Sequence, residues 1–249
     1  MLVTNFKLKY SLYKIILPFF QLFDTGRMHP VRERAIRALN KSVDYIEMNM
    51  PKAVGFETQK ELISYAIDEV KCAGVYLEFG VFTGGTLRYM AKKKSTEVFH
   101  GFDSFEGLPE DWSGTAWTKQ TFGVKGKLPK VPSNVTLHKG WFNETLPVWR
   151  ETYKDKVAFA HIDCDLYSST VDILENLASR LQVGSILLFD EYFNYPNWEN
   201  HEYKAWKEFV EKYQVSYDYI GFARQQVAVR ILKYNAKTLD NLSTCSGGA

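Results

Sequence analysis

Four acidic residues follow two apolar segments of this sequence, at the positions where buried strands would end. Asp163 and Asp165 come after residues 158–162, and Asp190 and Glu191 come after residues 185–189. In open α/β sheets, buried parallel strands are continuous apolar runs and ligands bind beyond their carboxyl ends. Oxygen donors suit Mg²⁺, Mn²⁺ or Ca²⁺ better than zinc, so these acids predict a divalent-metal site. The alternative is that each pair caps a helix or forms a salt bridge.

A glycine-rich turn follows a third apolar segment. Gly80, Gly84 and Gly85 lie between this segment and a helical stretch, an arrangement that lets the backbone approach a cofactor closely. The spacing differs from that of the dinucleotide-binding GxGxxG motif, and the acid Glu78 precedes the first glycine. Asp103 ends the next predicted strand, about 20 residues later, where Rossmann-like sheets place an acid that binds ribose hydroxyls. Together they predict a nucleotide-like cofactor.

The elements that must position these residues alternate between strand and helix after residue 74, which is typical of a doubly wound parallel sheet. We expect helices after Gly85, over residues 169–181 and over residues 199–213. We expect seven strands, at residues 75–79, 98–102, 135–138, 157–162, 186–189, 217–220 and 227–232. The predicted fold class is therefore α/β, with a Rossmann-like, seven-stranded, mostly parallel sheet.

Helical periodicity precedes the sheet. Apolar residues recur at helical spacing between residues 30 and 70, including Ile36, Leu39, Val43 and Ile46. We expect residues 1–70 to form an N-terminal helical cap that acts as a lid or in oligomerisation. Residues 71–235 then form the sheet domain, and the polar residues 236–249 form a flexible tail.

Composition and charge narrow the class of protein. The formal net charge of +2 is too small to indicate a nucleic-acid-binding surface. Three cysteines at unrelated spacings predict neither a disulfide framework nor a metal-binding motif, and favour a cytoplasmic location. The apolar run within residues 6–23 is far shorter than the about 20 residues that a membrane-spanning helix needs. We expect this segment to pack on the domain or on a second subunit of a homo-oligomer, with binding to a membrane surface as the alternative.

Five segments of the chain, taken together and in their order along the sequence, resemble the class I S-adenosylmethionine-dependent methyltransferases, in particular the macrocin O-methyltransferase (TylF) family. The resemblance covers residues 76–192, and each segment alone is common. The segments are residues 77–85, 102–109, 140–147, 161–167 and 190–192. The resemblance implies divalent-metal-assisted methyl transfer to a hydroxyl of a small-molecule acceptor, a sugar or a glycosylated natural product.

The resemblance also implies roles for individual residues. The metal would be Mg²⁺ or Mn²⁺, bound by Asp163, Asp190 and Glu191. Asp165 resembles the general base of the family, with Asp163 also at the catalytic centre. S-adenosylmethionine would be bound by Glu78, Gly80, Thr83, Gly84, Asp103, Ser104 and Asp163. Glu191 stands where many relatives have Asp, and its longer side chain can ligate a metal directly or through water.

Two histidines are alternative bases because histidine titrates near neutral pH. His201 follows the predicted fifth strand and is a candidate catalytic residue close to the acids in sequence. His161 lies within a predicted strand, and we expect it to be a hydrogen-bonded core residue.

Two other classes of protein remain open. A short-chain, nicotinamide-dependent oxidoreductase needs a Tyr-x-x-x-Lys pair on a helix, and Tyr203 and Lys207 have that spacing. The spacing also occurs at Tyr10 and Lys14, and this alternative leaves the four acids unexplained. The third class is a non-catalytic binding protein that retains the fold, since fold alone does not dictate function.

Overall fold

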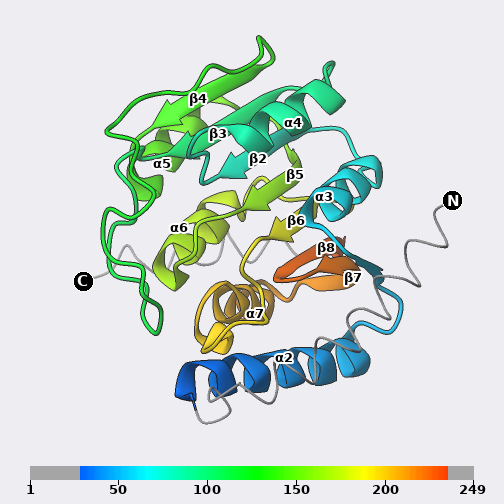
Figure 1. The fold of residues 1–249 in the computed structure, drawn as a ribbon. Helices are drawn as coiled ribbons and strands as arrows, with labels where there is room; N and C mark the ends of the chain where they lie inside the picture. The colour runs from blue at the N-terminus through cyan, green and yellow to red at the C-terminus, as the bar shows by residue number, and fades with distance from the viewer. Residues whose placement is uncertain (1–28, 235–249) are drawn as a thin grey trace, which may run out of the picture.

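The computed structural model describes residues 29–234, which form an α/β structure around one sheet (Figure 1). The strands lie in the order β1-β7-β8-β6-β5-β2-β3-β4. The expected Rossmann-like, mostly parallel sheet is confirmed, but the expected count of seven strands is wrong, because the sheet has eight. Our expectations for residues 6–23 and 236–249 lie outside the described residues.

The additional strand is β1, which comes from the predicted helical cap. It has three residues, pairs in parallel with β7 at the sheet edge, and exposes 44% of Val54. A strand of three residues that includes Gly55 is too short to show an alternation of apolar and polar positions, so it could not be predicted from the sequence. The strands are β1 (Val54–Phe56), β2 (Val75–Phe79), β3 (Phe99–Asp103), β4 (Val135–Lys139), β5 (Val157–Ile162), β6 (Ile186–Phe189), β7 (Ser216–Ala223) and β8 (Gln226–Lys233).

The order of the strands creates a crevice at the centre of the sheet. The chain passes from β2 to β3 and β4 on one side, and then returns to β5 and β6 on the other side of β2. All of these strands are parallel, and only β8 runs antiparallel to its neighbours β6 and β7. In such sheets, ligands bind where the strand order reverses, outside the carboxyl ends of the strands. The segments that follow β2, β3, β5 and β6 therefore emerge at one edge.

Helices cover both faces of the sheet. Side chains of α3 (Gln59–Asp68) and α4 (Gly85–Lys93) pack into one core, and those of α5 (Phe142–Thr152), α6 (Tyr167–Leu177) and α7 (Glu202–Tyr213) pack into the other. The helix expected from residue 199 begins at Glu202, because the preceding residues form the 3₁₀ turn η2 (Trp198–Asn200). No helix among residues 29–234 is long and apolar enough to cross a membrane.

The predicted cap contains the long helix α2 (Pro30–Asn49), which lies beside α7 at the outside of the molecule (Figure 1). Three residues of its apolar stripe face outward, since Ile36, Leu39 and Val43 are between 43% and 48% exposed, whereas the fourth, Ile46, is partly buried against the core. Polar contacts attach another face. The Ser42 hydroxyl accepts a hydrogen bond from the Asn194 amide at 2.8 Å, and the Tyr45 hydroxyl bonds to that of Tyr219 at 2.6 Å. The helix was therefore predicted correctly, but only Ile46 of its predicted apolar stripe packs against the core.

Candidate active site

A cavity of about 340 Å³ lies at the carboxyl edge of the central strands. Its volume falls in the range of about 300–1,000 Å³ that is usual for small-molecule sites. Aromatic and aliphatic side chains, including Phe82, Leu108 and Phe142, form much of its wall. The predicted site residues that line the cavity are Gly80, Asp103, Ser104, Asp163, Asp165 and Glu191. The structure thus brings the predicted cofactor-binding and acidic residues to one cavity.

The turn after β2 runs tightly against the segment after β5. Gly80 has φ +93°, and a Cβ atom on it would lie 1.7 Å from the carbonyl oxygen of Asp163. Only glycine combines this positive φ with the close approach of another backbone. Gly84 also has a positive φ and caps α4, while the carbonyl oxygen of Thr83 accepts a hydrogen bond from Arg88. Thr83 and Gly84 shape the turn but are not among the residues that line the cavity.

The carboxylate of Asp103 is oriented by two backbone amides. Its Oδ2 accepts a hydrogen bond from the amide of Phe82 at 2.7 Å, and its Oδ1 accepts one from Phe105 at 2.6 Å. Burial raises the pKa of this carboxyl, and these amides act in the opposite direction. The neighbouring Ser104 hydroxyl donates to the carbonyl oxygen of Gly107 at 3.2 Å. Asp103 therefore presents a fixed acceptor to the cavity, directly beside the glycine turn.

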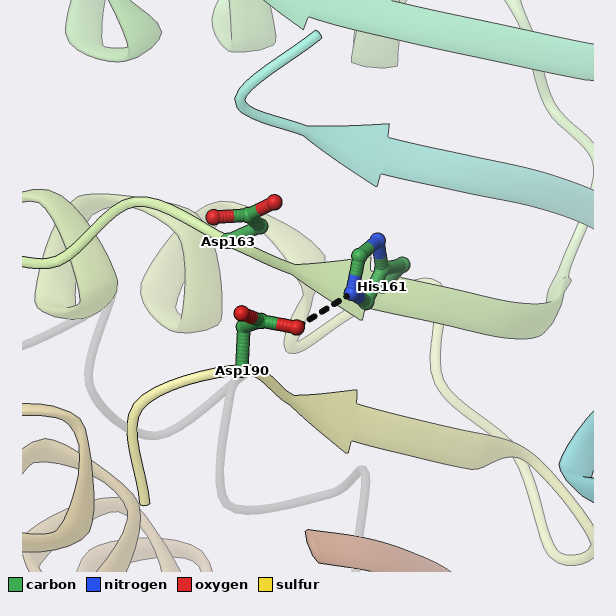
Figure 2. Close-up of side chains that lie close together, drawn as sticks. All are labelled: His161, Asp163 and Asp190. Carbon is green, nitrogen blue, oxygen red and sulfur yellow. Dashed lines mark hydrogen bonds and ion pairs between the residues drawn. The ribbon is translucent and has the colours of Figure 1, made fainter. Parts of the chain in front are cut away.

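His161 connects the ends of three neighbouring strands. Its Nδ1 lies 3.1 Å from Glu78 Oε1 and its Nε2 lies 3.3 Å from Asp190 Oδ1, and the latter contact is drawn in Figure 2. Burial lowers the pKa of His161, but the two carboxylates outweigh it and raise the pKa well above its ordinary value. The imidazole therefore lies between two acids that favour its protonated form. Glu78, predicted to bind cofactor, is buried beneath the cavity and does not line it.

The acids after β5 and β6 form two overlapping groups that share Asp163. In one group, ligand atoms of His161, Asp163 and Asp190 lie within 4.8 Å of one another, and in the other those of Asp163, Asp165 and Glu191 do so. Figure 2 shows Asp163 beside Asp190 at the ends of their strands. Burial first, and then the charge of Asp190, raise the pKa values of Asp163 and Glu191 well above the ordinary range.

Asp190 and Glu191 differ in the bonds they already make. Both oxygens of Asp190 are engaged, Oδ1 by His161 and Gln59, and Oδ2 by Gln226 at 3.3 Å. Glu191 Oε2 is buried and has no hydrogen-bond partner within the described structure. An unpaired buried carboxylate oxygen beside two more carboxylates is costly unless a cation joins them. The carboxylates of Asp163 and Glu191, with Asp165 beside them, therefore fit a divalent cation better than the group that contains Asp190.

Asp165 sits in a strained turn of the backbone. Its φ is +65°, and the amide of Leu166 bonds back to the carbonyl oxygen of Cys164 at 2.6 Å across it. A turn closed over three residues with a positive central φ is rare, and such strain concentrates at functional sites. Burial, followed by the charge of Asp190, raises the pKa of Asp165 to about 7. This carboxyl can therefore exchange a proton near neutral pH.

Neither alternative base lies in the cavity with the acids. His201 is buried at the start of α7, where its ring packs against Trp112 and Tyr195 with centroids about 6 Å apart. Burial lowers its pKa. His161 is buried and bonds to the carboxylates of Glu78 and Asp190, so it is the hydrogen-bonded core residue that we expected. Asp165 is the candidate base that lines the cavity.

One further acid of this region, Glu202, was not predicted from the sequence. Its side chain is fully buried behind the acids, where Oε2 accepts a hydrogen bond from the amide of Glu191 at 3.1 Å. Burial raises the pKa of Glu202 to about 8. A Glu in the first turn of a helix is ordinarily an exposed partner of the helix dipole, so its type and position gave no sign of burial.

Comparison with known proteins identifies the class of fold. Residues 77–192, from β2 to the segment after β6, match the family model described as a methyltransferase domain. The crystal structure of the calicheamicin methyltransferase CalS11 superposes with a TM-score of 0.59 at 23% identity, covering 83% of this chain and 93% of that one. The O-methyltransferase NovP superposes with a TM-score of 0.56 at 23% identity, covering 70% and 79%. The fold is the Rossmann-like methyltransferase fold.

Two curated relatives are similar in sequence. One is 8-demethyl-8-(2,3-dimethoxy-alpha-L-rhamnosyl)-tetracenomycin-C 4'-O-methyltransferase of Streptomyces olivaceus, 30% identical over 158 residues that span 52% of this chain and 58% of the relative. The other is demethyldecarbamoylnovobiocin O-methyltransferase of Streptomyces niveus, 34% identical over 88 residues that span 35% of this chain and 29% of the relative. The matched region thus covers less than two thirds of either relative. Both names describe O-methyltransferases, and neither names the macrocin family.

The buried acids predict that the protein, freed of metal by EDTA, loses stability as the pH rises from 6.5 to 8. Asp165 and Glu202 have pKa values of about 7 and about 8 when folded, against 3.8 and 4.5 ordinarily. The folded protein therefore holds protons that the unfolded chain has released, and its stability falls until the pH passes the folded pKa values. Each group contributes up to about 1.4 kcal/mol per pH unit.

Calorimetric unfolding at pH 6.5, 7.25 and 8 measures this trend. Burial lowers the pKa of His100 to about 4. This group makes stability rise with pH, but only below its ordinary pKa of 6.5, so it does not mask the expected fall in stability above pH 6.5. Mg²⁺ should stabilise the protein more at pH 8 than at pH 6.5, because cation binding requires the ionised acids. A midpoint that rises with pH in EDTA would show that these carboxyls are not protonated in the folded state.

Proposed function

We propose that this protein is an S-adenosylmethionine-dependent, divalent-metal-assisted O-methyltransferase of the macrocin O-methyltransferase (TylF) type. Its acceptor would be a hydroxyl of a sugar or of a glycosylated natural product. The observation that carries the proposal is the single cavity that joins the glycine turn and Asp103 to the acids after β5 and β6. The relatives' names, which describe O-methylation of a rhamnosyl-tetracenomycin and of a novobiocin precursor, support this acceptor class.

The glycine turn, Asp103 and Ser104 would hold the methyl donor. Asp103 is oriented by two amides and would accept hydrogen bonds from the ribose hydroxyls, as the acid after the second strand does in Rossmann-like sheets. Gly80 lets the turn lie directly against the carbonyl oxygen of Asp163, which keeps the turn at the cavity wall. Glu78 would act from below, through its contact with His161, rather than by touching the donor.

Asp163 and Glu191 would hold the Mg²⁺ or Mn²⁺ ion. These two residues belong to the predicted ligand set, and Glu191 has a buried oxygen without a partner. Asp190, the third predicted ligand, would position the site, since His161, Gln59 and Gln226 already occupy its oxygens. When bound, the cation supplies positive charge that lowers the pKa of the acceptor hydroxyl.

Asp165 would accept the proton of that hydroxyl. Its carboxylate lies within 4.8 Å of Asp163 and Glu191 and lines the same cavity. With its pKa near 7, Asp165 is available as a base at neutral pH. Fixing the oxygen in line with the methyl carbon can contribute about 7 to 11 kcal/mol over a bimolecular encounter. Two adjacent hydroxyls of the acceptor would bind best at three clustered carboxylates. We therefore propose that the acceptor carries a vicinal diol.

The oxidoreductase alternative receives less support. Tyr203 packs against Trp198 with ring centroids 4.8 Å apart, and the Lys207 ammonium donates to the Tyr217 hydroxyl at 3.3 Å. Neither residue lines the cavity. A cytoplasmic homo-oligomer remains our prediction for location and assembly.

Calorimetric titration with S-adenosylmethionine and NADH tests the proposed function. We expect binding of S-adenosylmethionine and of its demethylated product, S-adenosylhomocysteine, and loss of both in an Asp103→Ala variant. Transfer of labelled methyl groups to rhamnosides with adjacent hydroxyls should then require Mg²⁺ or Mn²⁺. Binding of NADH without binding of S-adenosylmethionine would contradict the proposal and favour the oxidoreductase.

A further inference from the structure

One buried acid lies between the two segments that carry the cavity's carboxylates. Glu202 begins α7, and its side chain is 0% exposed. Oε2 accepts a hydrogen bond from the amide of Glu191 at 3.1 Å, and Oε1 accepts a long one from the amide of Cys164 at 3.5 Å. The Cys164 thiol also points to Oε1, at 3.9 Å. One side chain thereby joins the segment after β5 to the segment after β6.

The two amides that Glu202 accepts from belong to the acid-bearing segments themselves. Cys164 lies between Asp163 and Asp165, and Glu191 directly follows Asp190. The two pairs of acids come from neighbouring strands, β5 and β6, and the last backbone hydrogen bond between them among the described residues runs from the Asp190 amide to the carbonyl oxygen of Ile162 at 2.8 Å, so no backbone bond joins residues 163–165 to Glu191. A contact that joins these amides fixes the separation of the acids, which in turn decides whether they can share one cation.

Glu202 has no cationic partner to explain its burial. Within residues 29–234, it forms no salt bridge, and the nearby charges of Asp190 and Asp165 oppose its ionisation. A buried carboxyl without hydrogen bonds is strongly destabilising, so the amides of Glu191 and Cys164 are what stabilise it here. A residue that only filled space at this position would be better replaced by an apolar side chain.

We propose that Glu202 is a positioning residue that holds the two acid-bearing segments at the spacing required for cation binding. This inference rests on the proposed function, because it assigns the acids to a cation. Residues that support metal ligands from behind fix ligand geometry, and their replacement typically costs about 10- to 100-fold in metal affinity. Glu202 would act on the cation through Glu191 and through the segment that contains Cys164, without touching it.

Glu202→Gln is the variant that tests this role. Gln has nearly the same shape but only one acceptor oxygen, so its NH₂ group must face one of the two amides. Glu208→Gln is the matched control, since Glu208 lies on the same helix and bonds at the surface to Tyr167 and Lys204.

The first measurement is amide hydrogen exchange by NMR on the metal-free proteins. We expect slow exchange at Cys164 and Glu191 in the wild type and in Glu208→Gln, and at least tenfold faster exchange at one of them in Glu202→Gln. If either amide exchanges at the rate of an open loop in the wild type, the inference is overturned, even where Glu202→Gln fails to fold.

The second measurement is Mn²⁺ and S-adenosylhomocysteine affinity by calorimetry. Glu202→Gln should bind Mn²⁺ about 10- to 100-fold more weakly than wild type, with S-adenosylhomocysteine affinity unchanged. Equal Mn²⁺ affinity in wild type and Glu202→Gln overturns the inference and leaves the proposed function standing. If the wild type does not bind Mn²⁺ although the amides of Cys164 and Glu191 exchange slowly, the role of a cation in the proposed function and the positioning role of Glu202 are both overturned. An equal loss of affinity for both ligands shows general destabilisation and also overturns the positioning role.

Discussion

Replacing Asp165 by Asn should lower kcat by about 10²- to 10⁴-fold, the usual contribution of a positioned general base. Asn retains the size of the side chain but cannot accept a proton, and Asp165 is the candidate base that lines the cavity. The affinity for S-adenosylmethionine should remain unchanged, because Asp103 and the glycine turn bind it in our account. Steady-state methyl transfer with a labelled donor measures both quantities.

Asp172→Asn is the matched control for this substitution. Asp172 lies on α6, the helix that follows the same segment, outside the residues that line the cavity. We expect its variant to retain wild-type kcat. With Mg²⁺ bound, the wild type should also gain activity with rising pH over a range below about 7, because the cation favours the ionised form of Asp165, whose pKa is about 7 without metal. An Asp165→Asn enzyme with wild-type kcat would exclude Asp165 as the base.

Replacing Asp163 by Asn should abolish the dependence of methyl transfer on Mg²⁺ and lower kcat/KM about 100-fold or more. Asp163 is the acid that both groups of possible ligands share. Loss of the charge supplied by a bound cation is worth several kcal/mol, and each 1.36 kcal/mol corresponds to about a factor of ten in rate. Treating the wild type with EDTA should produce a loss of similar size, reversed by Mg²⁺. Assays of methyl transfer across a range of Mg²⁺ concentrations measure both effects.

Asp190→Asn separates the two possible ligand sets. Because His161, Gln59 and Gln226 engage the oxygens of Asp190, we expect this variant to bind Mn²⁺ more weakly but still measurably. If Asp190→Asn abolishes Mn²⁺ binding and Asp163→Asn does not, the cation lies beside Asp190 and our assignment is wrong.

Much of the sheet and several site residues could be predicted because short-range patterns determine them. The strands β2, β5 and β6 are buried on both faces and are therefore mainly apolar, with Glu78 and His161 as the exceptions, and their predicted bounds match the structure. Parallel strands present their carboxyl ends at one edge, so the acids after β5 and β6 had to emerge together with the glycine turn. Gly80 could be singled out because its type reflects a backbone approach that only glycine allows.

Features that depend on long-range packing were not predictable. The strand β1 depends on pairing with β7, about 165 residues later in the chain, rather than on its own three residues. The apolar stripe of α2 indicated a helix but not the face that packs, because Ser42 and Tyr45 form polar contacts while Ile36, Leu39 and Val43 stay exposed. Glu78 was singled out by its place before the glycine turn, but its contact with His161 joins two separate strands and could not be read from that turn. Glu202 had no sequence signal, since its amide partners come from two other segments.

A crystal structure with S-adenosylhomocysteine and Mn²⁺, with anomalous scattering used to locate the metal, would show whether methyl donor and cation share this cavity. We expect the ribose hydroxyls at Asp103, the sulfur facing Asp165, and the Mn²⁺ peak in contact with Asp163 and Glu191. A nucleoside bound away from Asp103, or a Mn²⁺ peak remote from these acids, would show that the proposed site is wrong.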